Sequence, residues 1–270
     1  MDSAEQETDK KGMPLWKFLA LLAAFAWVLR SFIVAPFMIP SGSMMPTMLV
    51  GDYLFVSKWP YGYSKWSFPL QIPSFEGRIL ESMPERGDIV VFQSPDASKE
   101  IVVKRVIGLP GDEIEMRSGH VVLNGTPLPK ERMRDFGLQI SQNSPCNVAA
   151  GARPFIEPDG EGGEICRYPA YRETLPSGRS YTVLDQVDGY ADALGPYTVP
   201  AGHLFMLGDN RDASGDSRFS ISDGGVGYLP MENVIGRAEM NFWSTDGSAS
   251  YFLPWTWFTA LRGSRVGVTY

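Results

Sequence analysis

The sequence contains few of the residues that build metal sites and disulfide scaffolds. Among its 270 residues there are two cysteines and two histidines. Cys146 and Cys166 lack the CxxC spacing of a zinc site, and two cysteines are too few for a disulfide framework. A histidine-rich metal site is not expected either, so we predict that the protein uses no metal and no cofactor.

Long runs of positive charge are also absent. The formal net charge is −7, and lysine and arginine do not cluster. A nucleic-acid interface needs clustered cations that release phosphate counterions, so we predict no nucleic-acid partner. With 44% hydrophobic and 20% charged residues, the chain can bury a sizeable core, as one large β domain or as two ordinary domains.

One apolar stretch lies near the N-terminus. "FLALLAAFAWVL" (18–29) carries no charge, and extended to residues 15–35 it reaches the roughly 20 residues that a membrane-spanning helix needs. Lys17 and Arg30 lie near its ends, where long cationic side chains can reach the lipid headgroups. Three lysines precede the uncharged run and only Arg30 follows it closely. This bias favours a single-pass anchor with a cytoplasmic N-terminus (1–14) and the rest of the chain outside.

Two other interpretations of this stretch compete with the anchor. Ala24-Phe25-Ala26 has the A-x-A form of a secretory cleavage site, although it lies inside the apolar run with no polar segment before it. A buried helix in a soluble core can have a similar composition. We favour a retained anchor in contact with membrane lipid over both.

Beyond Pro40 the pattern is that of β structure. Short runs of β-branched and aromatic residues are separated by Gly, Pro, Asp and Asn. The clearest runs are 52–58, 87–95, 100–112, 120–125 and 202–210. No run of comparable length has an amphipathic helical period, so the predicted fold class is mainly β with antiparallel sheets, preceded by the N-terminal transmembrane helix.

Composition changes along the chain predict its division into domains. Strand patterning in 36–112 gives way to a polar, irregular region over 113–201 and returns in 202–270. We therefore expect an antiparallel β-sheet domain in two parts, 36–112 and 202–270, with an inserted second β-rich lobe at 113–201. Residues 59–83, rich in Pro, Ser and aromatics, are expected to form a hairpin excursion from the first part.

Both cysteines fall within the predicted lobe. Cys146 and Cys166 are 20 residues apart, and a bridge between them would contribute on the order of 3 kcal/mol if the lobe lies on an oxidising side of the membrane. The alternative is two unpaired, buried thiols. We favour the bridge.

The histidines give little indication of a catalytic site. Neither His120 nor His203 has an obvious Asp or Ser companion. A lysine can activate a serine instead if burial in apolar surroundings lowers its pKa. Lys104, in "IVVKRVIGLPG", has the most apolar neighbourhood of the lysines, and in a strand it would point away from Arg105.

A serine that such a lysine could activate follows the apolar stretch. In "IPSGSMMPT" (39–47), Ser43 is preceded by a glycine and followed by Met44-Met45-Pro46. Glycine permits an unusual backbone and proline restricts the residue before it, so this turn can expose a hydroxyl and a backbone N–H. Taken alone, the nine residues are also compatible with an ordinary turn.

Three segments together resemble a known family. "IPSGSMMPT", "KRVIGLPGD" (104–112) and "GDNRDASGDSR" (208–218), in this order behind an N-terminal apolar stretch, resemble the motifs of bacterial type I signal peptidases. The resemblance covers roughly Arg30 to Val106 and Gly202 to the end, and it leaves the predicted lobe largely unmatched. Three motifs in order are a specific signal.

The resemblance implies roles for individual residues. Ser43 is the implied nucleophile and Lys104 the implied general base, with the Ser41 hydroxyl and the backbone N–H of Ser43 as oxyanion donors. Ser214 matches the serine that orients the lysine, and Ala213 departs from the asparagine that many members have. Four charged residues match positions that support the site: Asp209, Arg211, Asp216 and Arg218.

The resemblance also implies an activity and a location. Such an enzyme is a membrane-anchored serine endopeptidase that removes N-terminal signal peptides from exported preproteins through an acyl-enzyme. Its catalytic domain lies on the periplasmic or outer face of the inner (plasma) membrane, and its contact with the protein-export translocon is transient. Two alternatives are a soluble, self-cleaving Ser/Lys repressor and a membrane-tethered, extracytoplasmic β module that binds peptides without catalysis.

Overall fold

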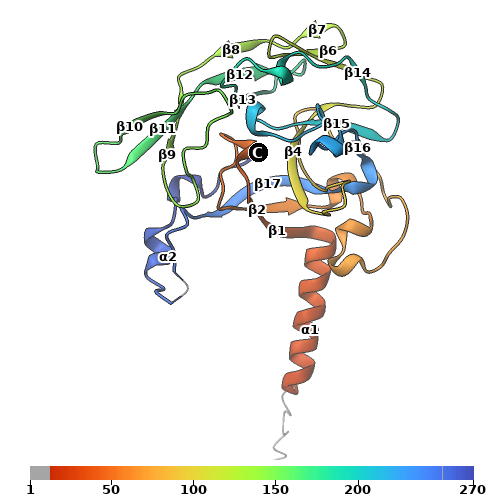
Figure 1. Cartoon of the computed structure of the whole chain (residues 1–270). Coiled ribbons are helices and arrows are strands. Elements are labelled where there is room, and N and C mark those ends of the chain that lie inside the picture. The colour runs from red at the N-terminus through yellow and green to blue at the C-terminus, as the bar shows by residue number, and fades with distance from the viewer. Residues whose placement is uncertain (1–12, 251) are drawn as a thin grey trace, which may run out of the picture.

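The computed structural model describes residues 13–250 and 252–270. A long helix, α1 (Leu15–Val28), continues as a π-helical turn, η1 (Leu29–Ile33), and projects from a β-rich body (Figure 1). No residue of α1 is buried, so the alternative of a buried core helix is wrong. The segment Leu15–Ile33, 19 residues long, is long and apolar enough to cross a membrane.

This helical segment ends two residues before the predicted limit at residue 35. Val34 and Ala35 belong to strand β1 (Val34–Met38), which pairs with β2 (Asp52–Ser57). Their backbone groups are satisfied by the sheet rather than by a further helical turn. The predicted cytoplasmic segment, 1–14, lies outside the described residues except for its last two.

Seven antiparallel strands form the main sheet, in the order β1, β2, β17, β3, β4, β15 and β16. The remaining members are β3 (Ile89–Gln93), β4 (Ile101–Gly108), β15 (His203–Leu207), β16 (Leu229–Pro230) and β17 (Val234–Ser244). Four of the strands predicted from sequence belong to this sheet, and the mainly β class is confirmed.

Strand β3 lies deep in the molecule and contributes to two cores. Val90 and Phe92 belong to one buried apolar cluster, whereas Ile89 and Val91 belong to another. Successive side chains of a strand point to opposite faces, so the sheet is covered on both sides here. The same alternation separates Lys104 from Arg105 on the neighbouring strand β4.

Three smaller antiparallel sheets come from residues 113–201, and β6, β7, β8 and β12 lie on the side of the body away from α1 (Figure 1). The four-stranded sheet contains β14 (Tyr197–Thr198), β5 (Glu113–Arg117), β6 (His120–Leu123) and β7 (Thr126–Pro127). One three-stranded sheet contains β13 (Ser180–Leu184), β12 (Ala170–Thr174) and β8 (Lys130–Arg132). The other contains β10 (Phe155–Pro158), β11 (Glu164–Tyr168) and β9 (Phe136–Gln139). A disulfide joins Cys166 of β11 to Cys146.

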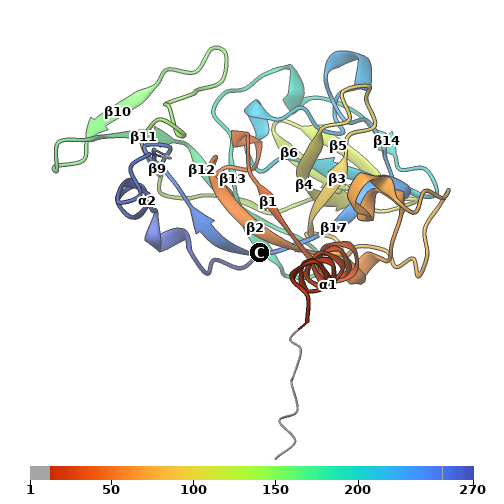
Figure 2. The ribbon, with the colours of Figure 1, turned by 90° about the horizontal axis from the view of Figure 1, so that it is seen from below.

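Residues 59–83 form an irregular excursion beside the body end of α1 (Figures 1 and 2). It contains three short 3-10 turns, η3 (Trp59–Tyr61), η4 (Lys65–Ser67) and η5 (Pro69–Gln71), and one isolated antiparallel bridge. The ring of Phe68 lies 5.3 Å from that of Phe32 in η1. Aromatic packing against η1, rather than regular strand pairing, therefore shapes this segment.

Candidate active site

Ser43 lies in a tight turn between β1 and β2. The 3-10 turn η2 (Gly42–Met44) carries it, and the turn is held by the buried side chains of Met44 and Met48. Backbone pairing of Ile39 with the start of β2 closes the loop, since Ile39 N–H donates to Asp52 O over 2.8 Å. The sequence "SGSMM" thus places small polar residues on one side and large apolar residues in the core.

Lys104 reaches this turn from strand β4. Its Nζ lies 2.6 Å from Ser43 Oγ, although 61 positions separate the two residues. The lysine side chain is 3% exposed. Burial lowers the pKa of Lys104 to about 8, against the opposing effect of the Asp216 and Asp209 carboxylates. A lysine in this position can hold or release a proton near physiological pH.

Ser41 lies next to the same hydroxyl. Its Oγ is 3.4 Å from Ser43 Oγ, at the long end of hydrogen bonding, and either atom can be the donor. Ser41 and Ser43 also line one groove of about 290 Å³. The other lining residues are mainly apolar and come from β1, the turn and β4: Phe37, Met38, Ile39, Pro40, Met44, Glu100, Ile101, Val102 and Val103.

Ser214 approaches the turn from the "GDNRDASGDSR" segment. A side chain at Gly208 would collide with Ser214 Oγ and with the carbonyl oxygen of Ser43, so Gly208 permits this close approach. The Ser214 hydroxyl is buried and has no hydrogen-bond partner within the described part of the chain. The structure therefore brings Ser214 close to the Ser43 turn without a hydrogen bond to Lys104.

The four predicted supporting residues are buried in ion pairs beside the site. Asp209 accepts two hydrogen bonds from Arg105, with distances of 2.8 Å from Nε and 2.6 Å from Nη2. Arg218 Nε donates to Asp216 Oδ1 over 2.9 Å, and Arg211 pairs with Glu173 of β12. Each pair is desolvated and mutually compensated, so these charges hold loops together.

Burial and pairing act in opposite directions on Asp216. Burial is the largest single effect and disfavours the charged form, but the Arg218 guanidinium and the hydrogen bonds to the carboxylate together outweigh it and hold the pKa of Asp216 below its usual value. Asp216 Oδ2 also accepts a hydrogen bond of 3.0 Å from the backbone N–H of Gly208. The ionised carboxylate therefore fixes the glycine at which Ser214 and the Ser43 turn meet.

Asn210 contacts the turn directly, and the sequence reasoning assigned it no role. Its backbone N–H donates to Ser43 O over 3.0 Å, and its side-chain Nδ2 donates to Gly42 O over 3.1 Å. Glu173 and Arg105 were missed as well, because their partners are distant in sequence. The only sequence signal for Asn210 was its place within the "GDNRDAS" motif.

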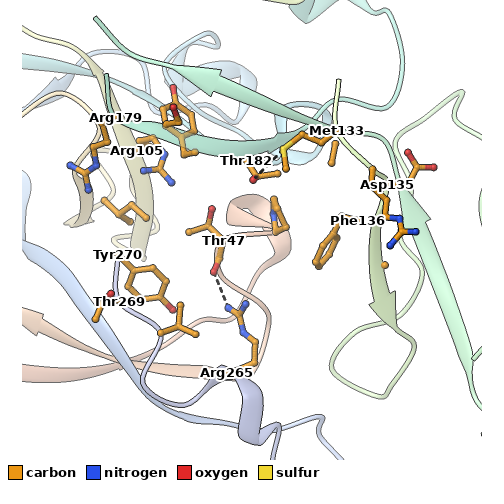
Figure 3. Close-up of a pocket in the computed structure, with 18 residues that line it drawn as sticks. Thr47, Arg105, Met133, Asp135, Phe136, Arg179, Thr182, Arg265, Thr269 and Tyr270 are labelled. Carbon is orange, nitrogen blue, oxygen red and sulfur yellow. Dashed lines mark hydrogen bonds between the residues drawn. The ribbon is translucent and has the colours of Figure 1, made fainter. Parts of the chain in front are cut away.

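A larger cavity, of about 610 Å³, lies elsewhere (Figure 3). Arg105, Arg179 and Arg265 line it, and each of the three is already paired with an aspartate. Arg265 Nη2 also donates to Thr47 O over 2.8 Å (Figure 3). None of the residues lining this cavity is Ser41, Ser43, Lys104 or Ser214, so the groove next to Ser43 is the better candidate for a substrate site.

Comparison with known proteins identifies the chain as a serine endopeptidase, a hydrolase. A model of the family described as signal peptidase, peptidase S26, matches residues 13–243, and the chain belongs to that family. The family resemblance seen in the sequence is thereby confirmed, and the alternative of a self-cleaving repressor is not supported.

Curated relatives match along most of their length. Signal peptidase I of Rickettsia canadensis is 36% identical over 250 residues, covering 88% of this chain and 82% of the relative. Signal peptidase I of Rickettsia rickettsii is 35% identical over 253 residues, covering 90% and 84%. A crystal structure of a signal peptidase I from Enterococcus faecalis is 27% identical and covers 58% of this chain and 97% of its own, with a TM-score of 0.29, too low to support a structural conclusion.

Proposed function

We propose that the protein removes signal peptides from exported preproteins, with Ser43 as the nucleophile and Lys104 as the general base. The observation that carries this proposal is the 2.6 Å separation of Lys104 Nζ and Ser43 Oγ in a buried setting. A serine hydroxyl is a weak nucleophile until an adjacent base removes its proton. Burial supplies that base by keeping the lysine pKa low.

We propose the following course for the reaction. Neutral Lys104 takes the Ser43 proton as Oγ attacks the scissile carbonyl carbon, and a tetrahedral oxyanion forms. Lys104 then gives the proton to the leaving amine, which releases the mature protein and leaves the signal peptide as an ester on Ser43. Water, deprotonated by Lys104, attacks the ester, and Ser43 regains its proton. Ser214 is proposed to position the lysine amine through these steps.

The Ser41 hydroxyl is proposed as an oxyanion donor together with the backbone N–H of Ser43. Ser41→Ala is expected to lower kcat by about 10²- to 10³-fold with little change in KM, because such a donor acts mainly on the transition state. Steady-state kinetics on a preprotein would measure this. A loss confined to KM, or a change of less than about threefold, would assign Ser41 to the shape of the turn instead.

Cleavage is expected to slow as the pH falls below about 8. The pKa of Lys104 is lowered to about 8 by burial, and the protonated amine cannot accept the Ser43 proton. From that pH downward, kcat/KM should fall about tenfold per pH unit. Ser214→Ala should displace this acidic limb if Ser214 positions the amine, whereas altered packing alone would lower the rate equally at every pH. Full activity at about pH 6 would contradict a lysine base.

The groove is proposed to hold the substrate as an extended peptide. β1 is an edge strand, and Ile101–Val103 of β4 have no partner on the side away from β3 within the described residues. An extended segment can add to such an edge, with alternate side chains entering the groove. The family resemblance implies small residues, such as alanine, at the first and third positions before the cut.

The anchor is proposed to hold this site at the membrane. We infer a single pass with a cytoplasmic N-terminus, and a catalytic domain outside the inner membrane built from 36–112 and 202–270 with the lobe 113–201 inserted. The helical segment ends at Ile33, ten residues before Ser43. This short separation supports a position of Ser43 near the bilayer surface, where the cleavage site of a signal peptide would emerge. Tethering raises the effective concentration of membrane-held substrate, including substrate arriving from the export translocon.

The proposal is tested with the purified full chain in detergent and a preprotein substrate. Cleavage at one site, identified by the N-terminal sequence of the product and unaffected by a metal chelator, is the expected result. Binding of the signal peptide without cleavage would instead favour the peptide-binding module.

A further inference from the structure

A third, smaller pocket lies where the helical segment joins the body. Its volume is about 210 Å³, several times the roughly 30 Å³ that one water molecule occupies. Arg30 of η1 and Lys58, at the end of β2, are among its lining residues, together with Trp66. No aspartate or glutamate is among the described residues that line it. The pocket is therefore cationic and lacks a built-in counter-charge.

Lys58 is an unusual residue to find in such a place. It is 3% exposed, and its Nζ donates to the carbonyl oxygen of Ser67. Among the described residues no carboxylate lies within ion-pair distance of it. Burial, and next the nearby Arg30, lower the pKa of Lys58 to about 8, so the ammonium is still mostly charged at neutral pH. A buried charge of this kind is costly unless an anion compensates it.

Trp66 lines the same pocket and carries a further hydrogen-bond donor. Its indole Nε1 is buried and has no hydrogen-bond partner within the described ranges. An indole N–H can only donate, so its unmet need is for an acceptor. Two cations and an unpaired N–H in one pocket together call for a group with several acceptor oxygens and negative charge.

The position of the pocket indicates the source of that group. Arg30 lies near the end of the candidate membrane span, Leu15–Ile33. Leu70, which also lines the pocket, is 89% exposed, and the excursion around it packs beside the body end of α1 (Figure 2). A ligand with an anionic group and apolar chains can place the anionic group in the pocket, at the level of the lipid headgroups, and its apolar chains along exposed apolar side chains such as Leu70.

We infer that this pocket binds the phosphate group of a membrane phospholipid through Arg30, Lys58 and Trp66. The guanidinium and the ammonium neutralise the phosphate, and the indole N–H donates to one of its oxygens. Phe37 and Ile101 line both this pocket and the groove next to Ser43. The bound lipid therefore lies beside the peptide groove and helps fix the height of the catalytic site above the bilayer.

Native mass spectrometry of the full chain tests this directly. The protein is solubilised in a neutral detergent with phosphatidylglycerol, and the fraction that retains one lipid is compared among variants. Arg30→Gln and Lys58→Met should each weaken retention at least about tenfold, since each removes one charge-assisted interaction. The matched control is Lys17→Gln, which removes a cation from the other end of the same helical segment and should leave retention unchanged.

Two further arms identify the ligand. Diacylglycerol with the same acyl chains should be retained at least about tenfold less than phosphatidylglycerol, since it lacks the phosphate. Equal retention of the two lipids, or equal retention by the parent and Arg30→Gln, would overturn the proposal. If inorganic phosphate stabilises the protein against heat and no lipid is retained, the claim that the phosphate belongs to a membrane lipid would be refuted. If Lys58→Met does not fold, Arg30→Gln decides alone, since Arg30 is exposed. These readouts do not involve cleavage, so their failure is distinct from failure of the proposed peptidase mechanism.

Discussion

Replacing Ser43 by alanine is expected to lower kcat for preprotein cleavage by at least about 10⁴-fold, because no other group at this position can form the acyl-enzyme. The substitution removes one oxygen atom from a side chain that is 9% exposed, so the turn should keep its shape. Binding of the signal peptide should persist, because the groove is lined mainly by other residues. Initial rates and peptide binding, measured on the same preparation, check both expectations.

The matched control is Ser220→Ala, which removes an exposed hydroxyl from the same protein. Ser220 Oγ contacts Ser222 and Asp223 in a surface turn and takes no part in the groove. The control should cleave at the parental rate. Comparable rates for Ser43→Ala and Ser220→Ala would refute Ser43 as the nucleophile.

Lys104→Met is expected to reduce kcat by a similar factor, at least about 10⁴-fold, while making the fold more stable at neutral pH. Methionine fills the apolar path of the lysine stem without an amine. Folding lowers the lysine pKa from 10.5 to about 8, so the folded state binds this proton more weakly than the unfolded chain does. This difference lowers the free energy of unfolding of the parent protein by on the order of 3 kcal/mol at pH 7.

The loss of stability caused by the lowered pKa of Lys104 depends on pH. It is fully present below about pH 8 and disappears as the pH rises through the unfolded value of 10.5, where the lysine is neutral in both states. Urea unfolding of the parent and of Lys104→Met should therefore differ most at neutral pH and converge in alkali. Lys99→Met, an exposed change, should alter neither stability nor rate. A Lys104→Met protein that cleaves at the parental rate would exclude the dyad.

The two activity losses together separate catalysis from folding. A misfolded Ser43→Ala or Lys104→Met protein would lose both peptide binding and cooperative unfolding. An inactive protein that binds peptide and, for Lys104→Met, unfolds at higher urea points to chemistry. Because Ser43 and Lys104 act as one unit, the effects of the two substitutions should not add. The double variant should therefore cleave at nearly the same rate as the slower of the two single variants.

The sequence by itself determined the local elements and the class of protein. Strand β3 could be predicted because its β-branched run is bounded by turn residues. Helix α1 could be predicted because a long, uncharged apolar stretch is typical of a membrane-spanning helix. A local pattern was enough to predict both elements, although β3 is held in the sheet by pairing with β4 and with the distant β17. Three ordered motifs gave the family, and with it the candidate roles of Ser43 and Lys104.

Only the tertiary structure decided which groups meet. The 2.6 Å contact between Lys104 and Ser43 and the ties from Asn210 to the Ser43 turn join segments distant in sequence. The end of the helical segment at Ile33 depends on pairing of β1 with β2. The placement of Arg30 and Lys58 in one pocket depends on packing of the excursion against η1. Such contacts arise from pairing and burial across the whole chain, so a local pattern of residues cannot specify them.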